Sequence, residues 1–302
     1  MSSSSFSSKV ALVAFSLVGL VAFFPMLHAE SRPSISFNFT PIDHPGATVT
    51  NCYAANKSGI IVGDFTDTGG IVHGYARLAN GTFKTLDYPG AISTSPLRIN
   101  DSNQVVGIYV DSSNVKHGFL FTSPNHFAAI NYPGAAQTEV YGINNGGQIV
   151  GTWYDSLGAA SGFSLLNGSY TNLVYPNSLG TAAADVNTVG AICGFWIDTN
   201  GLFHGFLLTK AINGTYSQVD YPGAARTYIF GLNDSNQVVG KYLDTSRVTH
   251  GWGADLKRNQ YLTIDVPGSV YDQVVGITNA AHLTGTFTDT SLVTHGFLAV
   301  PK

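Results

Sequence analysis

The chain has 302 residues, of which 44% are hydrophobic and only 11% are charged, a balance that excludes a disordered protein and suffices for a sizeable core. The formal net charge is −4, and the 14 lysines and arginines form no basic run, so we expect no nucleic-acid partner. No motif for a metal ion or cofactor is present, and we predict none.

Residues 1–29 have the pattern of a signal peptide. Lys9 is followed by an apolar run over residues 10–24, and Ala29 provides a small residue at the expected cleavage point. The run of about 15 residues is short for a membrane span. We therefore predict export, with cleavage after Ala29 and no membrane span in the mature chain, which would be secreted or held in the periplasm or at the cell surface. An uncleaved anchor is the alternative.

One unit recurs along the rest of the chain. Its first marker is Asp43-His44-Pro45-Gly46-Ala47, and versions of it begin again at Asp87, Asn131, Val174, Asp220 and Asp265. A His-Gly pair and a glycine followed four residues later by aspartate recur in the same phase. Three markers in phase indicate tandem repeats. The units cover about residues 43–86, 87–130, 131–173, 174–219, 220–264 and 265–300.

Each unit contains four short runs of β-branched and aromatic residues, bounded by Asn, Asp, Gly and Ser, which is typical of β-hairpins. Four antiparallel strands repeated six times predict an all-β, six-bladed β-propeller. The last unit lacks its fourth run, and residues 36–42 supply a matching one at the other end of the chain. We therefore predict that this N-terminal strand completes the last blade and closes the ring.

The units resemble a known repeat. Segments such as Gly142-Ile143-Asn144, Gln148-Ile149-Val150-Gly151 and His117-Gly118-Phe119-Leu120 resemble the HAF-type extracellular repeat of bacterial secreted proteins, although glycine stands where that family usually has its middle alanine. The resemblance covers the whole mature chain. It implies export and a propeller-like fold, and it implies no catalytic residue.

An aspartate precedes the repeated histidine by six residues in five units, and the two lie across one hairpin, where the carboxylate can accept a hydrogen bond from the imidazole. Two interpretations stay open: a ring of metal or proton-transfer sites, and a structural link within each blade, similar to the network of WD-repeat propellers. We favour the structural link, because a site needed once is not normally copied into every blade. The pairs are Asp67/His73, Asp111/His117, Asp198/His204, Asp244/His250 and Asp289/His295.

A row of tyrosines, with acid or amide groups beside it, recurs where the chain crosses to the next blade. Such a row can anchor the Pro-Gly turns, or it can bind a sugar through aromatic faces and hydrogen-bonding groups. The candidate ligand-binding residues are Tyr88, Tyr132, Tyr175, Tyr221, Asp87, Asn131 and Asp220.

No catalytic constellation is apparent, and we assign no catalytic residue. There is neither a Gly-x-Ser-x-Gly nor a His-Glu-x-x-His motif. Arg98 and Arg226 are isolated cations that could meet an anion, and we favour the alternative that they are solvated at the surface. Acids and histidines outside the repeat phase are Asp64, Asp185, Asp255, Asp272, His126 and His282.

The two cysteines of the mature chain, Cys52 and Cys193, fall in units one and four, on opposite sides of a six-fold ring. A disulfide requires Cα atoms within roughly 7 Å. We therefore expect two free thiols.

These observations lead to the hypothesis of a secreted, non-enzymatic binding or scaffold propeller, with a glycan or cell-wall polysaccharide as the expected ligand class. The alternative is a polysaccharide lyase or hydrolase acting at one channel mouth. That alternative requires the irregular positions Ser161, Val174 and Asn177 to gather with Asp185 or His126 around one cleft.

Overall fold

The computed structural model describes residues 35–302, and every regular element in that range is a β-strand. The compact unit Ser36–Lys302 contains 24 strands, in four four-stranded sheets and one eight-stranded sheet. A parallel bridge between Val49 and Thr294 joins two blades into that larger sheet, so the strands make six groups of four. The prediction of an all-β propeller with four antiparallel strands per blade is confirmed, and the 24 strands fit six blades.

The strands of each blade follow one another in the chain. Blade 1 contains β2 (Val49–Ala55), β3 (Ile61–Thr66), β4 (Val72–Arg77) and β5 (Phe83–Thr85). Blade 2 contains β6 (Ser93–Ile99), β7 (Val105–Val110), β8 (Lys116–Thr122) and β9 (His126–Ile130). Blade 3 contains β10 (Gln137–Ile143), β11 (Ile149–Tyr154), β12 (Ala160–Leu166) and β13 (Ser169–Leu173).

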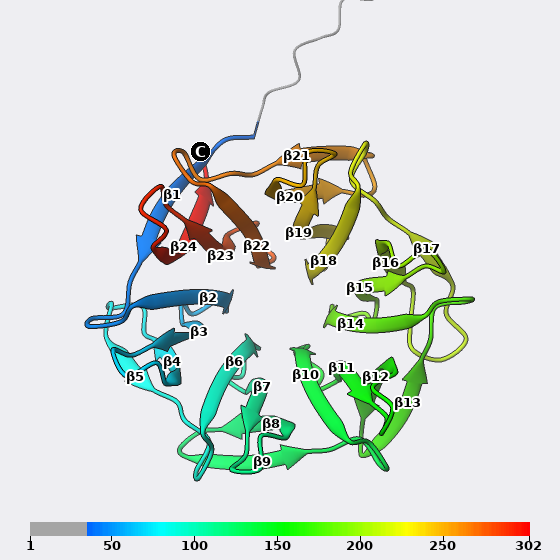
Figure 1. Ribbon diagram of the computed structural model, residues 1–302, viewed down its shortest axis with the longest axis horizontal. Helices are drawn as coiled ribbons and strands as arrows, with labels where there is room; N and C mark the ends of the chain where they lie inside the picture. Colours follow the sequence, from blue (N-terminus) through cyan, green and yellow to red (C-terminus); the bar gives the residue numbers. More distant parts are fainter. Residues whose placement is uncertain (1–34) are drawn as a thin grey trace, which may run out of the picture. The chain divides into compact units, whose positions relative to one another are not determined.

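Blade 4 contains β14 (Gly180–Val186), β15 (Ile192–Ile197), β16 (Phe203–Leu208) and β17 (Tyr216–Gln218). Blade 5 contains β18 (Arg226–Leu232), β19 (Gln237–Leu243), β20 (Thr249–Asp255) and β21 (Gln260–Thr263). Blade 6 contains β22 (Tyr271–Ile277), β23 (Leu283–Thr288), β24 (Thr294–Pro301) and β1 (Phe37–Ile42). The first strands of the blades face the centre of the ring, and the fourth strands lie at its rim (Figure 1).

The N-terminal strand closes the ring. Strand β1 pairs antiparallel with β24, in a register that runs from Phe37 opposite Pro301 to Ile42 opposite Gly296. Phe37 and Phe39 pack against the core cluster of blade 6. The predicted exchange of chain ends is therefore confirmed, and both edges of β24 are paired.

Hydrophobic clusters fill the space between successive blades. One of them joins Ala54 and Val62 of blade 1 to Ile99, Val105 and Phe119 of blade 2. The glycine of the His-Gly marker allows the blades to approach, because a Cβ on Gly296 would lie 2.4 Å from Cys52 Sγ in the neighbouring blade. Repetition of this marker therefore reflects close packing between blades.

Both cysteines are free and fully buried, Cys52 in β2 and Cys193 in β15. Burial raises the pKa of the Cys52 thiol to about 12. Each thiol belongs to a different core cluster.

A one-residue β-bulge interrupts the first strand of every blade, where the pairing with the second strand shifts by one position. A bulge redirects the side chain of its extra residue. The six bulged residues all line one pocket on the axis: Tyr53, Leu97, Tyr141, Ala184, Phe230 and Val275.

Candidate functional site

At the crossover between blades, the acid or amide beside a tyrosine of the row contacts the preceding blade, and the tyrosine contacts the next one. The Asp87 carboxylate accepts a hydrogen bond from Gly74 N (2.8 Å) and lies 2.8 Å from His73 Nδ1, so it is tied to the blade just completed. Tyr88 stacks on Tyr109 of the next blade, with ring centroids 3.7 Å apart. The same acid or amide contact recurs in the pairs His117/Asn131, His204/Asp220, His250/Asp265 and His295/Asp43.

The turn itself has the geometry expected for Tyr-Pro-Gly-Ala. Ala91 N donates to Tyr88 O (3.1 Å), and Gly90 has a φ of 80°, which is the left-handed conformation that a type II turn requires. The other three tyrosines of the row stack in the same way on the second strand of the next blade: Tyr132 on Trp153, Tyr175 on Trp196 and Tyr221 on Tyr242.

The aspartate six residues before each histidine is the more distant of its two partners, the nearer one being the acid or amide at the crossover. His117 Nε2 lies 3.1 Å from Asp111 Oδ2, whereas the corresponding His250–Asp244 distance is 3.8 Å. These aspartates mainly hold their own turns, since Asp67 Oδ1 accepts hydrogen bonds from the backbone of Gly69 and Ile71. The histidine therefore connects the hairpin turn to the crossover. The hydrogen bond to Asp87 raises the pKa of His73.

Two cavities lie on the axis of the ring. The turn-side cavity, of about 420 Å³, is lined by the ends of the six first strands and the turns that follow them. The axial pocket, of about 170 Å³, is lined by the bulged residues together with Arg98 and Gln273. Neither cavity is lined by any residue of the tyrosine row or its neighbouring acids.

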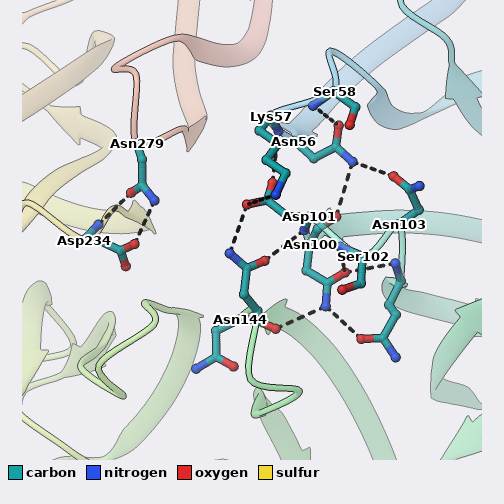
Figure 2. A network of polar contacts seen from close by, with 12 residues as sticks. Asn56, Lys57, Ser58, Asn100, Asp101, Ser102, Asn103, Asn144, Asp234 and Asn279 are labelled. Carbon is teal, nitrogen blue, oxygen red and sulfur yellow. Dashed lines mark hydrogen bonds and ion pairs between the residues drawn. The ribbon is translucent and has the colours of Figure 1, made fainter.

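A ring of asparagines surrounds the turn-side cavity. Each asparagine donates through Nδ2 to the backbone carbonyl of its counterpart in the next blade, as in Asn100 to Asn144 (3.2 Å) and Asn144 to Asn187 (2.8 Å). Figure 2 shows part of this network. The asparagine ring consists of Asn56, Asn100, Asn144, Asn187 and Asn233, and ends at Thr278.

A second row of polar groups follows the asparagine ring. Asn279 Nδ2 donates to Asp234 Oδ2 (2.7 Å), and Asn145 Nδ2 donates to Asp101 Oδ2 (3.0 Å) (Figure 2 shows the Asp234–Asn279 pair). Lys57 N donates to Asp101 Oδ1 (3.0 Å). These groups bond to one another between blades, so their contacts join the blades at this mouth.

Arg98 crosses the axis at the boundary of the two cavities, both of which it lines. Its Nη2 donates to Phe230 O (2.6 Å), and its Nε lies 3.3 Å from Asp185 Oδ1 in blade 4. Arg98 is only 7% exposed and Asp185 only 5%. Burial raises the pKa of the Asp185 carboxyl, and the charge of Arg98 opposes that shift.

The interpretation of Arg98 as a solvated surface cation is therefore wrong. Its side chain extends from the inner strand β6 into the centre of the ring, where the equivalent residues are small in four blades: Ala54, Gly142, Gly231 and Gly276. Burial of a guanidinium is tolerated here because a carboxylate and backbone carbonyls surround it.

Three aromatic rings from different blades meet in the axial pocket: Tyr53, Tyr141 and Phe230. The two hydroxyls are held by buried acids, since Tyr53 donates to Asp64 Oδ2 (3.1 Å) and Tyr141 donates to Glu139. Burial raises the pKa of the Asp64 carboxyl. The pocket thus has fixed aromatic walls with the Arg98 guanidinium at one end.

The irregular positions of the repeat do not gather around one cleft. Asp185 and His282 line the turn-side cavity, and Asp255 pairs with Arg258 in an exposed turn. The other irregular residues line neither axial cavity: Ser161, Val174, Asn177 and His126. The arrangement that the enzyme alternative requires is therefore not found at these cavities.

Within residues 35–302, no group of three or more His, Cys, Asp or Glu side chains has a geometry that could hold a metal ion. In the same part of the chain, no helix is long and apolar enough to cross a membrane.

Comparisons with solved structures show the fold. A mutant of AofleA from Arthrobotrys oligospora matches 89% of this chain over 88% of its own, with a TM-score of 0.56 and 10% identity. The lectin of Aleuria aurantia, described as a six-bladed β-propeller with a novel mode of fucose recognition, matches 86% of this chain over 93% of its own (TM-score 0.52, 10% identity). A gluconolactonase from Xanthomonas campestris matches 88% over 90% (TM-score 0.52, 10% identity).

No protein-family model matches the sequence, and no curated protein does. At about one residue in ten identical, the structural matches establish a propeller of this type and carry no site residues across.

Proposed function

We propose that this chain is an exported, non-enzymatic binding propeller whose ligand is a glycan, bound at the axial pocket. The observation that carries the proposal is the meeting of Tyr53, Tyr141 and Phe230 in one concave site. Ligand sites are typically concave and mostly apolar, with a few placed polar groups. Here the polar groups are the Arg98 guanidinium and the Gln273 amide, and the aromatic faces suit the apolar face of a sugar ring.

This proposal moves the ligand site from the tyrosine row to the bulged residues on the same side of the blades. The row is engaged in stacking and in contacts with the repeated histidines, as Tyr88 and Asp87 illustrate. The bulged residues, by contrast, differ between blades and face the axis. A site that must recognise one ligand is expected where the blades differ.

Two further points support the proposal. The Aleuria aurantia lectin, which has the same fold, is described as recognising fucose. Residues 1–29 have the pattern of an export signal, and an exported protein meets extracellular polysaccharides.

The proposal is tested by screening the full chain against a panel of neutral and acidic saccharides, followed by calorimetric titration with those that bind. We expect Phe230→Leu, which removes the aromatic face and keeps an apolar side chain, to weaken binding about tenfold, or about 1.4 kcal/mol. The matched control is Phe127→Leu in the outer strand β9, which should leave affinity unchanged. Equal effects of the two variants, or no binding to any saccharide, would refute the proposal.

A further inference from the structure

Two cations near the axial pocket have no acidic partner. Arg226 and Lys241 are both half-buried, yet in the described residues no carboxylate oxygen forms an ion pair with either side chain. Charged groups taken partly out of water are normally paired. Unpaired cations in such a position are suited to an anionic ligand.

Aromatic rings surround both cations instead. Lys241 Nζ lies 5.2 Å from the ring centre of Tyr228 and 5.7 Å from that of Tyr271, whose hydroxyl it contacts at 3.2 Å. The Arg226 guanidinium lies 5.6 Å from the ring centre of Phe203. Cation–π contacts orient these side chains and leave hydrogen-bond donors free, since a lysine ammonium has three and an arginine has five.

The strand geometry connects the cations to the pocket. Arg226, Tyr228 and Phe230 alternate along β18, and Lys241 pairs with Tyr228 on the neighbouring strand. Lys241 Nζ also lies 5.8 Å from the ring centre of Phe230, which lines the axial pocket. The cations and the pocket are therefore parts of one surface.

The acids on the other side of the axis are already satisfied. Asp64 accepts hydrogen bonds from Asn51 and Ser95 as well as from Tyr53, and Glu139 is paired with Lys116 at 2.6 Å. They do not neutralise the cations of blade 5. The surface beside the pocket thus has a fixed asymmetry of charge, with its unpaired positive end at Lys241 and Arg226.

We propose that the glycan bound at this site is acidic, with a uronic acid residue whose carboxylate contacts Lys241 and Arg226 while a sugar ring occupies the axial pocket. This inference rests on the proposed function and specifies its ligand class. Charge-assisted hydrogen bonds to a carboxylate are about twice as strong as neutral ones, so the carboxylate should dominate selectivity.

The experiment compares an oligogalacturonate with its methyl ester, which has the same sugar rings without the charge, by calorimetric titration of the full chain. We expect the acid to bind at least about tenfold more tightly than the ester at low salt, and the preference to shrink at high salt. Lys241→Met, which keeps the apolar stem over the rings, should weaken binding of the acid far more than binding of the ester, so that most of the preference is lost.

Two variants locate the effect. Lys241→Arg, which keeps the charge, should retain the preference, and Lys84→Met in the outer strand β5 should not alter it. Equal affinities for acid and ester, or an acid preference that survives in the double variant Lys241→Met/Arg226→Gln, would overturn the inference while leaving the glycan proposal in place. Absence of binding to either form and to every other saccharide would refute both.

Discussion

Arg98 and Asp185 occupy a repeat position that the other four blades fill with alanine or glycine. The inner strands are close together here, since a Cβ on Gly142 would lie 2.9 Å from the Asp185 Cα. The centre of the ring therefore accommodates two large side chains only because their neighbours are small. Their charges compensate each other across the axis at 3.3 Å.

We expect Asp185→Ala to lower the free energy of unfolding by about 3 to 5 kcal/mol, because it leaves the buried Arg98 charge without its carboxylate. The double variant Arg98→Ala/Asp185→Ala should lose less than the sum of the two single variants. Urea denaturation of the four proteins measures this coupling, and additive losses would show that the two side chains do not interact.

Asp272 replaces the threonine that accepts the crossover N–H in the other five blades, and its Oδ1 accepts a hydrogen bond from Val266 N (2.9 Å). Burial raises the pKa of Asp272 to about 6. Between about pH 4 and the folded-state pKa of Asp272, the folded state binds more protons than the unfolded state. The contribution of Asp272 to the free energy of unfolding therefore falls as the pH rises.

Asp272→Asn mimics the protonated acid and should remove that loss. Near pH 4, we expect the variant and the natural protein to have the same free energy of unfolding. At pH 7, that of the variant should be higher by on the order of 1 kcal/mol. Asp272→Thr, which installs the residue of the other blades, is the control and should show the same flattened profile. Urea denaturation at several pH values checks this, and a constant difference across the range would contradict the expectation.

At the scale of strands and turns, the asparagine ring joins the blades where their hydrophobic contacts end. Each asparagine has two roles, since Asn144 Oδ1 accepts hydrogen bonds from Gly146 and Gln148 within its own turn, while its Nδ2 donates to Asn187 O of the next blade. The bonds within the turn fix the loop, and the bond between blades fixes the spacing of the ring.

Asn144→Asp separates these roles, because the carboxylate still accepts the bonds of its turn but no longer donates to Asn187. We expect the free energy of unfolding to fall by about 1 to 3 kcal/mol, since Asn187 O loses one of its two donors, keeps only Gly190 N, and faces a negative charge. The same substitution at the exposed Asn125 should change stability by less than about 0.5 kcal/mol. Thermal and urea denaturation measure both, and equal effects would contradict an interblade role.

The strands and their grouping could be predicted because one pattern is repeated six times, and the pairing of β1 with β24 followed from a missing fourth strand. The β-bulges could not be predicted from the sequence, because the bulged residues have no side-chain property in common and no glycine marks the positions, as Tyr53, Leu97 and Ala184 illustrate. Without the bulges, the aromatic pocket could not be found.

The partners of the repeated histidines show a second limit of sequence analysis. The aspartate six residues earlier is the obvious local partner, but the closer acid or amide lies 14 to 16 residues later within the chain, at the next crossover. If the six units are aligned at the repeated asparagine, Arg98 and Asp185 fall at the same position. The ion pair between them could have been inferred from that coincidence.

At the scale of the whole molecule, stability depends on closure by β1. This strand contributes Ile42, which is buried, and Phe37 and Phe39, which pack on blade 6. It also satisfies the outer edge of β24 along six residue pairs. Strand β24 therefore has no free edge at the junction of the chain ends.

A chain that begins at Asp43 lacks β1 but keeps the carboxylate that contacts His295. We expect it to lose roughly 5 kcal/mol of stability, from the apolar side chains of β1, and to associate through the exposed edge of β24. A chain that begins at Ser36 is the control and should behave as a stable propeller. Thermal denaturation and light scattering after size-exclusion chromatography compare them, and equal stability of the two chains would contradict a closing role.

The same pairing governs the order in which the molecule can be completed during synthesis. Apart from the contacts of Arg98 across the axis and those of blade 1 with blade 6, the contacts of blades 1 to 5 link neighbouring units, so these blades can begin to form as the chain emerges. Asp43 and His295, by contrast, meet at the closure and are 252 residues apart. Contacts of such long range form slowly, because the entropy of closing a large loop opposes them. The first strand to be made must therefore wait unpaired until the last one arrives, and ring closure is expected to be the final and rate-limiting step of folding.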